Sequence, residues 1–574
     1  MRAVSLAVVI AVILPLVLGQ FWAYQLGLYA LYAAAAVGVG LCWGQAGFLP
    51  LGQALFFGLA AYLSGFAFIA FQNQIFLALV ALPFIALASG LLAYGIGAVV
   101  FGRTGESGAY FSMITLALSL LAFQIATSWN SVTGGFDGLK GIPGLPGLDD
   151  FSDVYYVSAA VLLVVLAFAG WLYMAPIGVL WRALAQNERR LQLFGFDTNQ
   201  IKSVAFGVSG LMAGVGGAIY APQQGIVTPQ LVGFGLSADL VIWAAVGGRA
   251  SLLGPVIGTL LVGSLSAQLR DSLPFWEVLM ALFFIATVLV FPRGIAGLPE
   301  PLLLRFMKPR SSAAAIAAPD GIAKKLPAKL ALHEITVRVG EVTILDRLSI
   351  EFDQGGIFCV IGPNGAGKTS MFNVVSGELA AAFGQIAIGS SDVLGLPSSG
   401  VSRLGVARKL QIPSVFPDLS IADNLAIALW GGRAGMLQLL NPRLRRWTSP
   451  MLKELQSRYP FLASGARTAA ELSHGEQQIL ELAMALLTEP RVLLLDEPCA
   501  GLSPHETAAV MEIIRWAAQR LGGAIIIIEH DMSLVKELAE VVYVLHNGAL
   551  LAKGNVAAIQ ANPDVRAVYV GGEK

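Results

Sequence analysis

The sequence predicts a polytopic α-helical membrane domain of about 8–10 spans, followed by a soluble α/β domain that contains a glycine-rich phosphate loop. Composition is the first reason. Of the 574 residues, 56% are hydrophobic and only 13% are charged, and the mean hydropathy is +0.72, which is too apolar for a soluble chain of this length. The second reason is a stretch without any Asp, Glu, Lys or Arg between Arg2 and Arg103. The third is the segment VIGPNGAGKTSMFNVVSGE at residues 360–378.

Charge and cysteine content argue against two other classes of protein. The formal net charge is +0, so the chain lacks the basic excess that a nucleic-acid binder uses to neutralise phosphates. The three cysteines, Cys42, Cys359 and Cys499, are widely separated and follow neither a disulfide framework nor a zinc-site spacing. We expect each of them to be a small core residue.

Hydrophobic segments long enough to cross a bilayer recur through the first 300 residues. The candidate spans are 3–18, 23–42, 52–71, 75–101, 108–127, 155–173, 203–221, 236–248, 252–268 and 275–291. The segment 236–248 is short enough to be re-entrant instead of spanning. A signal peptide is the alternative for 3–18. No small-residue cleavage site follows it and apolar sequence resumes at once, which favours an uncleaved helix.

Basic residues in short loops predict the orientation of the spans. The basic positions are Arg182, Arg189, Arg190 and Lys202 in one loop, and Arg293, Arg305, Lys308 and Arg310 after the last span. The loop 129–153 is instead acidic, with Asp137, Asp149, Asp150 and Asp153 against Lys140. Because basic loops stay in the cytoplasm, we expect both ends of the membrane domain, and everything after it, on the cytoplasmic side.

The predicted domains are a membrane domain at 1–300, a linker at 301–328 and an α/β domain at 329–574. The linker is predicted because KPRSSAAAIAAPDGIAKKLPA, at 308–328, mixes Pro, Ser, Ala and Lys without an amphipathic period. After it, the β-rich runs GIFCVIG (356–362), RVLLLDE (491–497) and AIIIIEH (524–530) alternate with helical stretches. This pattern is typical of a parallel sheet that is covered on both faces.

The phosphate loop fits G-x-x-x-x-G-K-[ST] and lies between a predicted strand and a predicted helix, as that motif requires. Its glycines let backbone N–H groups approach phosphate oxygens, Lys368 is expected to reach the β- and γ-phosphates, and Thr369 is a candidate Mg²⁺ ligand. The expected nucleotide-binding residues here are Gly362, Pro363, Asn364, Gly365, Ala366, Gly367, Lys368, Thr369 and Ser370. A merely glycine-rich turn would not need this strand and helix on either side.

A second motif, VLLLDEP, ends an apolar strand in two carboxylates. Asp496 is a candidate to hold Mg²⁺, and Glu497 to polarise an attacking water, since phosphoryl transfer depends on positioning and charge stabilisation. An apolar run that ends in Asp-Glu is common by itself, so its meaning depends on the phosphate loop.

The segment LSHGEQQ, Leu472 to Gln478, is expected to begin a helix and resembles the signature sequence of ABC-type ATPases. The resemblance extends in order to Gln411, matching the loop that links nucleotide state to the membrane partner, and to His530, matching a γ-phosphate-sensing histidine. It implies an ABC-type nucleotide-binding domain that uses ATP and Mg²⁺. The implied roles are catalytic for Glu497, His530 and Gln411, metal-binding for Thr369, Asp496 and Gln411, and contact with nucleotide on a partner subunit for Ser473, Gly475 and Glu476.

Three positions depart from that family pattern. His474 replaces the usual first glycine of the signature pair, and Ser503 stands where an aspartate is usual. Val339 occupies a position that often carries an aromatic residue stacked on adenine. The resemblance therefore implies weak stacking of the base.

Parts of the first half resemble the permease subunit of importers for branched-chain amino acids and related compounds. They are GQAGFLPLGQALFFG (44–58), TGGFDGLKGIP (133–143), NERRLQLFGFD (187–197) and LVFPRGIAGL (289–298). A helix predicted at 183–194 resembles the coupling helix that docks on an ATPase of this family, although a basic loop can also serve topology alone. The polar residues Gln45, Gln53 and Asp239 are candidates for a substrate path, with helix packing as the alternative.

Together these resemblances imply an ATP-driven importer subunit, with permease and ATPase fused, in a bacterial inner membrane. The solute would be a branched-chain amino acid or a related small polar or amphipathic compound. The implied partners are a second permease, a second ABC ATPase, an extracytoplasmic substrate-binding protein and membrane lipid, with no nucleic acid. The alternatives are an ABC exporter half-transporter, an importer of urea, amides or aromatic acids, and a soluble mechanochemical ABC ATPase of the DNA-repair type. The charge-free stretch between Arg2 and Arg103 argues against the exporter, and the lack of heptads and basic runs argues against the soluble ATPase.

Overall fold

The computed structural model describes residues 19–104, 108–147, 151–291, 294–297, 316–319, 328–353 and 355–570. The chain divides into two compact units, one made of Met1–Ala185 with Asn199–Ser311 and the other of Gln186–Thr198 with Ser312–Lys574. The predicted span 3–18, most of the linker 301–328, and the basic residues Arg293, Arg305, Lys308 and Arg310 lie outside the described residues. The same holds for Asp149 and Asp150 in the acidic loop.

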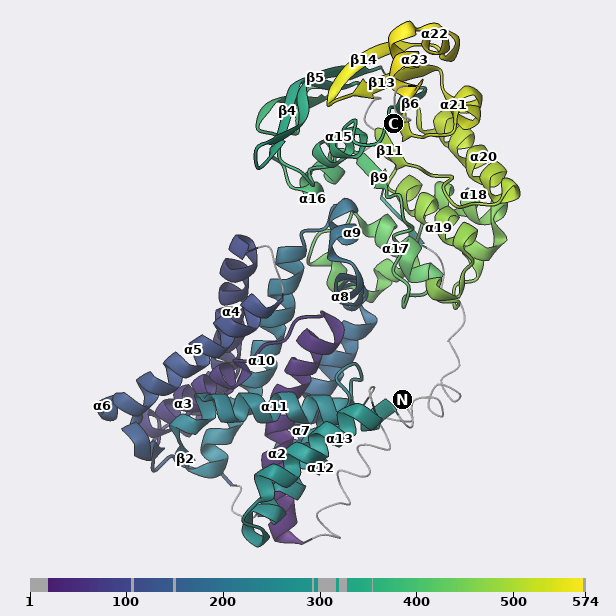
Figure 1. Ribbon diagram of the computed structural model, residues 1–574. Helices are drawn as coiled ribbons and strands as arrows, with labels where there is room; N and C mark the ends of the chain where they lie inside the picture. Colours follow the sequence, from purple (N-terminus) through teal and green to yellow (C-terminus); the bar gives the residue numbers. More distant parts are fainter. Residues whose placement is uncertain are drawn as a thin grey trace. The chain divides into compact units, whose positions relative to one another are not determined.

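The first unit is built from helices, and its described residues include six that are long and apolar enough to cross a membrane (Figure 1). They are α2 (Gln20–Gly40, continued by a π-helical turn at Leu41–Gln45), α3 (Gln53–Ala70), α4 (Ile75–Thr104), α5 (Ala109–Ser128), α7 (Phe151–Met174) and α10 (Thr198–Gln224). Each corresponds to a predicted span between residues 23 and 221. The smaller elements of this region are α6 (Asn130–Thr133), α8 (Pro176–Gln186) and the antiparallel pair β1 (Leu139–Lys140) and β2 (Ile226–Val227).

The last three predicted spans correspond to α11 (Phe234–Gly247, 14 residues), α12 (Gly254–Ser272, 19 residues) and α13 (Trp276–Val290, 15 residues). At 1.5 Å per residue, the 14 residues of α11 cover about 21 Å, which is less than the ~30 Å of a bilayer's hydrocarbon core. Within the described residues, six helices meet the length and hydropathy expected of a membrane span, and the predicted span 3–18 lies outside those residues.

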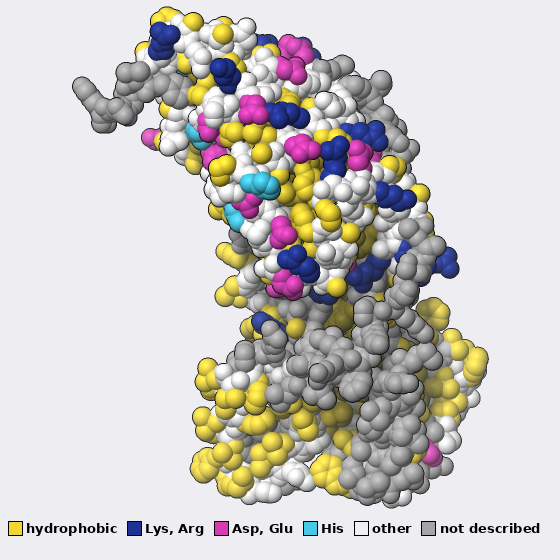
Figure 2. Space-filling model, turned by 90° about the vertical axis from the view of Figure 1, so that its right-hand side faces the viewer, with side chains coloured by type: hydrophobic (Ala, Val, Ile, Leu, Met, Phe, Trp, Pro, Cys, Tyr) yellow, Lys and Arg dark blue, Asp and Glu magenta, His cyan; other side chains and the backbone are white. Residues whose placement is uncertain are grey.

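Burial separates central from peripheral helices in this unit. In α2, α3 and α10, 78%, 61% and 67% of the apolar window is buried inside the chain, against 28%, 22% and 28% in α4, α5 and α7. Glycine allows two central helices to approach closely, because a Cβ at Gly217 of α10 would lie 1.9 Å from the Phe57 carbonyl oxygen of α3. A Cβ at Gly44, in the π-helical turn, would likewise lie 1.8 Å from the carbonyl oxygen of Arg249 in the loop after α11. Hydrophobic side chains gather on the visible face of this unit (Figure 2), as expected for a surface in contact with lipid.

Two of the three polar candidates for a substrate path make hydrogen bonds between segments of this unit. The Gln45 side chain donates to the Ala250 carbonyl oxygen at 2.7 Å, and the Gln53 side chain donates to that of Ser209 at 2.9 Å. Both glutamines are buried, so these bonds favour the helix-packing alternative. Asp239 is exposed on α11.

The second unit contains a six-stranded sheet in the order β14-β13-β6-β12-β11-β9, parallel except for β14. Its strands are β6 (Ile357–Ile361), β9 (Val406–Lys409), β11 (Val492–Asp496), β12 (Ala524–Ile528), β13 (Val541–His546) and β14 (Ala549–Gly554). An antiparallel sheet in the order β5-β4-β7-β8 holds β4 (Leu330–Val339), β5 (Val342–Phe352), β7 (Phe383–Ile388) and β8 (Ser391–Asp392). The remaining strands, β3 (Ile316–Ala317) and β10 (Trp447–Thr448), pair with each other.

Helices cover the six-stranded sheet, as the sequence predicts (Figure 1). The helices of this unit after the phosphate loop are α15 (Lys368–Val375), α16 (Ser398–Arg403), α17 (Ile421–Trp430), α18 (Pro450–Arg458), α19 (His474–Leu487), α20 (Pro504–Leu521), α21 (Met532–Leu538), α22 (Val556–Ala561) and α23 (Pro563–Val570), of which α17 and α18 pack on α19 and not on the sheet. The predicted strands correspond to β6, β11 and β12, in which every residue is buried. Cys42, Cys359 and Cys499 are free and buried, which confirms them as core residues. The parallel arrangement brings the carboxyl ends of β6, β11 and β12 to one edge of the sheet, where the predicted motifs begin.

Candidate active site

The phosphate loop connects β6 to α15 through glycines in conformations that other residues rarely adopt. Gly367 caps α15 at a φ of 95°, in the left-handed region. A Cβ at Gly362 would lie 2.3 Å from the Leu545 carbonyl oxygen, so a side chain there would push the loop off the sheet. The loop thus exposes backbone N–H groups at a helix N-terminus, the arrangement that binds phosphate.

Lys368 lies folded over this loop. Its Nζ donates to the carbonyl oxygens of Gly362 at 2.7 Å and Pro363 at 3.0 Å. Burial lowers the pKa of Lys368, while the nearby carboxylates of Glu497 and Asp496 raise it in opposition. The lysine therefore belongs to the same electrostatic site as the two acidic residues that end β11.

Glu497 brings together the three residues expected to be catalytic. The Gln411 side chain donates to one Glu497 carboxylate oxygen at 2.8 Å, and His530 Nε2 lies 2.8 Å from the other. The Glu497 backbone has a positive φ of 44°, and its N–H donates to the Ile528 carbonyl oxygen at 3.0 Å. A glutamate held in this uncommon conformation by the neighbouring strand projects its carboxylate from the sheet edge.

Asp496 is buried at the end of β11, and Arg408 is its charged partner, with 3.5 Å between Nη2 and Oδ2. Burial raises the pKa of Asp496, and Arg408 opposes that shift. The sequence did not single out Arg408. The sequence feature that could have indicated Arg408 is the pair of charged residues in the short strand β9, VARK, whose four positions are all buried.

Glu529, next to His530, is a further buried carboxylate that the sequence analysis missed. Burial raises its pKa to about 6, repulsion from Glu497 and Asp531 adds to the rise, and hydrogen bonds from the backbone N–H groups of His530 and Cys499 oppose it. Its neighbour His530 donates that backbone bond at 3.3 Å. Glu529 thus adds a titratable group that is close enough to Glu497 for the two carboxylates to repel each other.

The signature segment begins α19, as predicted. Ser473 is the N-cap, and it forms a capping box with Glu476: the Ser473 hydroxyl accepts from the Glu476 N–H at 3.2 Å, and the Glu476 carboxylate accepts from the Ser473 N–H at 3.0 Å. Gly475 is buried against Glu506. Among the described residues, no hydrogen bond or ion pair joins Ser473, Gly475 or Glu476 to the phosphate loop of the same chain.

The structure describes all three positions that depart from the family pattern. Ser503 N-caps α20 through a second capping box, with its hydroxyl donating to the Glu506 carboxylate at 2.7 Å. His474 is the first residue of α19 and is exposed. Val339 lies at the end of β4, where 55% of its surface is exposed.

The helix predicted at 183–194 is interrupted, which corrects the expectation. Asn187 adopts an extended conformation between α8 and the short helix α9 (Glu188–Leu193), with φ of −157° and ψ of 90°. Its side-chain oxygen accepts from the Arg190 N–H at 2.9 Å and so caps α9. Asparagine is a strong N-cap residue, which explains why the helix restarts at this position.

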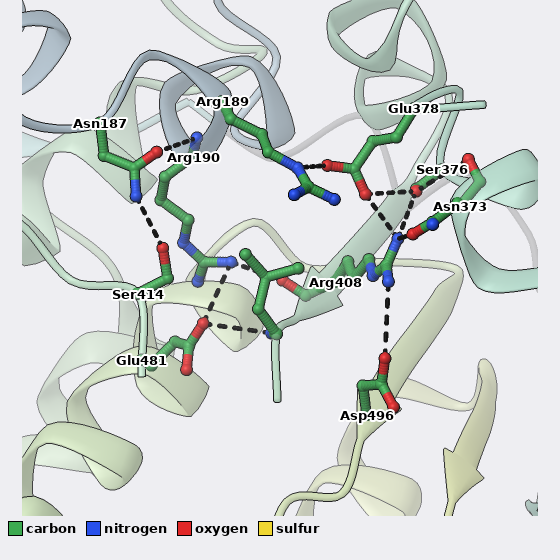
Figure 3. A network of polar contacts seen from close by, with 11 residues as sticks. Asn187, Arg189, Arg190, Asn373, Ser376, Glu378, Arg408, Ser414, Glu481 and Asp496 are labelled. Carbon is green, nitrogen blue, oxygen red and sulfur yellow. Dashed lines mark hydrogen bonds and ion pairs between the residues drawn. The ribbon is translucent and has the colours of Figure 1, made fainter. Parts of the chain in front are cut away.

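The segment 186–198 packs within the second unit, although it lies between helices of the first unit in the sequence (Figure 3). Arg190 is fully buried, donates to the Arg408 carbonyl oxygen at 2.7 Å and lies 3.3 Å from the carboxylate of Glu481 on α19. The Asn187 side chain donates to the Ser414 hydroxyl at 2.9 Å. The segment is therefore anchored to the strand and the helix that carry site residues.

Two family models match the two parts of the chain. Residues 21–291 match the family model described as the permease component of the branched-chain amino acid transport system, and residues 345–500 match that of the ABC transporter. The high-affinity branched-chain amino acid transport ATP-binding protein LivG of Salmonella typhimurium is 35% identical over 250 residues, which cover 42% of this chain and 97% of that protein. BraF of Pseudomonas aeruginosa, of the same description, is 32% identical over 254 residues, with 42% and 97% covered.

Among solved structures, a nucleotide-free ATP-binding cassette from an ABC transporter is 25% identical, with a TM-score of 0.37, over 42% of this chain and 98% of that one. The matches to known sequences and the six apolar helices make the chain a multi-pass inner-membrane protein whose ATPase domain is cytoplasmic and couples ATP hydrolysis to transport. The chain belongs to the branched-chain amino acid ABC transporter family, with the permease and the ATP-binding component fused in one polypeptide.

Proposed function

We propose that the protein uses ATP to import branched-chain amino acids or related small polar or amphipathic solutes. The part of this proposal that concerns ATP hydrolysis rests on the position of Glu497, which lies between Gln411 and His530 and near Lys368 of the phosphate loop. The importer direction is supported by relatives such as LivG and BraF, which are branched-chain amino acid transport proteins. The broad range of solutes, including urea, amides and aromatic acids, stays open as the alternative.

In this proposal, residues 362–370 cradle the phosphates and Lys368 reaches the β- and γ-phosphates of ATP. Glu497 accepts a hydrogen bond from the attacking water, because Gln411 and His530 hold its two oxygens in a fixed orientation. Mg²⁺ fits the donors present, since the Thr369 hydroxyl and the Asp496 carboxylate are oxygen ligands of the kind that the ion prefers, and Gln411 adds an amide oxygen. When bound, Mg²⁺ would neutralise charge that develops on the phosphates.

Partner subunits follow from the same proposal. Ser473, Gly475 and Glu476 would contact nucleotide held on the phosphate loop of a second ABC ATPase. In the described part of the chain their hydrogen bonds and ion pairs go to groups other than this chain's own loop, which fits that role. A second permease and an extracytoplasmic substrate-binding protein would complete the importer. Within the chain, residues 1–300 would act as the permease and 329–574 as the ATPase, joined by 301–328.

The test is uptake into proteoliposomes that hold the assembled complex, with its binding protein outside and ATP inside. We expect labelled leucine to accumulate inside only with ATP, and accumulation to disappear in Lys368→Ala. Competition by unlabelled urea, acetamide or benzoate would identify one of the alternative solutes. Accumulation that is independent of ATP, or ATP-driven release of solute from the vesicles, would contradict the import function.

A further inference from the structure

Four charged side chains of alternating sign form a continuous line of contacts in the second unit (Figure 3). Arg189, on α9, pairs with one carboxylate oxygen of Glu378. The other Glu378 oxygen accepts from Nη1 of Arg408, whose Nη2 lies 3.5 Å from Asp496. Arg189 is the exposed end of this line, with 59% of its side chain accessible, whereas only 7%, 2% and 4% of Glu378, Arg408 and Asp496 are accessible.

The position of the Arg408 guanidinium is fixed by several contacts to one end of it. Besides Glu378, Nη1 donates to the Asn373 side chain at 2.7 Å and to the Ser376 hydroxyl at 2.9 Å. Because the guanidinium is planar and rigid, fixing Nη1 also fixes the direction in which Nη2 meets Asp496. The Gln411 side chain does not fix Asp496 in this way, because it donates its hydrogen bond to the neighbouring carboxylate of Glu497.

The backbone beneath Arg408 is tied to the same segment. Arg190 donates to the Arg408 carbonyl oxygen at 2.7 Å, and Glu481, which holds Arg190, also accepts from the Leu410 N–H at 3.2 Å. The segment 186–198 therefore reaches Arg408 in two ways. Arg189 pairs with Glu378, which contacts the Arg408 side chain, and Arg190 donates directly to the Arg408 main chain.

We propose that Arg408 is a positioning residue for the Asp496 carboxylate, and that the segment 186–198 acts on Asp496 through Glu378 and Arg408. This inference rests on the proposed role of Asp496 in binding Mg²⁺. Displacement of the segment removes Arg189 from Glu378, so Glu378 and the guanidinium that it shares become free to reorient. The orientation of Asp496 then changes without any change in Gln411 or Glu497.

The experiment measures metal binding directly, in the assembled complex in nanodiscs. Mn²⁺ replaces Mg²⁺ as the probe, a non-hydrolysable ATP analogue is present, and electron paramagnetic resonance gives the dissociation constant of bound Mn²⁺. Arg408→Lys retains the charge but not the planar fork, so we expect Mn²⁺ binding to weaken about tenfold or more, as for other residues that orient a metal ligand. Arg189→Gln, which removes the exposed end, should weaken it about two- to fivefold.

Two further variants separate this route from general loss of structure. Arg515→Gln is the matched control for Arg189, because Arg515 also forms an exposed ion pair, with Glu537, and it should leave Mn²⁺ affinity unchanged. Glu378→Gln provides a second break in the line should Arg408→Lys fail to assemble, and it should weaken Mn²⁺ binding while the analogue still binds in the absence of metal. In the Arg408→Lys background, Arg189→Gln should have no additional effect, because the two act in series.

The outcomes distinguish this inference from the proposed function. If Asp496→Asn leaves Mn²⁺ affinity unchanged, the metal-binding role of Asp496 is wrong. If Asp496→Asn weakens Mn²⁺ binding but Arg408→Lys and Glu378→Gln do not, the positioning role of Arg408 is wrong and the proposed function stands. Additive effects of Arg189→Gln and Arg408→Lys would overturn the connection between the segment and Arg408.

Discussion

The backbone N–H of Leu191 donates a 3.3 Å hydrogen bond to the Asn187 carbonyl oxygen and closes the first turn of α9. Leu191 is fully buried in the second unit, so this turn presents the side chains by which the segment 186–198 is anchored. The helix is only six residues long, so no further helical turns can compensate for the loss of this hydrogen bond.

Leu191→Pro should therefore reduce transport more than basal ATP hydrolysis. Proline removes the 3.3 Å bond and adds a ring clash, at a cost of about 3 kcal/mol. Glu188→Pro is the matched control: Glu188 is the first residue of α9, where proline is tolerated, and Asn187 before it is already extended. Leucine uptake and ATPase rate would be measured on the same proteoliposomes. If the ratio of leucine uptake to ATP hydrolysis were the same in Leu191→Pro and wild type, the proposed role of the segment in coupling hydrolysis to transport would be wrong.

Glu497→Gln tests the residue that Gln411 and His530 orient. Glutamine keeps the shape and an acceptor for the Gln411 amide, but it loses the charge that polarises water. We expect turnover to fall at least ~10²-fold while ATP binding is nearly unchanged. Steady-state hydrolysis and equilibrium binding of labelled ATP would be compared in the assembled complex. An ATPase rate within a factor of two of wild type would show that another group performs this step.

Glu529 should make the stability of the ATPase domain depend on pH. Its pKa is raised from 4.5 to about 6 on folding, so the folded protein binds more protons than the unfolded chain between these values. Stability therefore falls as pH rises through this window, and the destabilisation is complete above it, at about 2 kcal/mol. Glu529→Gln should raise the unfolding temperature by about 4 °C at pH 7.5 and much less at pH 5.

Thermal unfolding of the full chain, followed by tryptophan fluorescence, would measure this difference. Glu512→Gln serves as the control, because Glu512 is an exposed carboxylate, paired with Arg458 on the surface. A stabilisation by Glu529→Gln of equal size at both pH values would mean that the carboxylate is not titrating in the window.

Local motifs were predictable from the sequence, and contacts between distant segments were not. The phosphate loop and the strand that ends in Asp496 are each contained in a few consecutive residues, so their strand, loop and helix were expected at the right places. Gln411 and His530 could be linked to Glu497 only by family resemblance, because they lie on different segments of the sheet edge.

The connections of Arg408 had no comparable pattern. It reaches Glu378, 30 residues away, and its carbonyl oxygen accepts from Arg190, 218 residues away, so neither contact is visible in a window of sequence. The break at Asn187 could have been found, since Asn followed by Glu is a usual helix start within an apparently continuous helical stretch. The short length of the segment 236–248 was visible in the sequence, and it corresponds to the 14-residue α11, which covers less than the thickness of a bilayer's hydrocarbon core.

Gly475 combines a local constraint with a proposed role across subunits. A Cβ at this position would lie 2.1 Å from a Glu506 carboxylate oxygen, and Ser503 holds that carboxylate in the capping box of α20. Alanine at Gly475 therefore tests the steric effect alone, whereas aspartate adds a negative charge near both Glu506 and the phosphates of a partner's nucleotide.

Gly475→Asp should block the site built on the partner's phosphate loop while ATP still loads at Lys368 of this chain. The added carboxylate repels the phosphates that the N-terminus of α19 would approach, and it displaces that turn through Glu506. Gly475→Ala should impair the same site less, because it lacks the charge. Photo-crosslinking of labelled ATP to each subunit, followed by vanadate trapping, would locate the loss. Loss confined to this chain's own Lys368 site, with the partner site intact, would mean that the signature acts on its own nucleotide and that the composite arrangement is wrong.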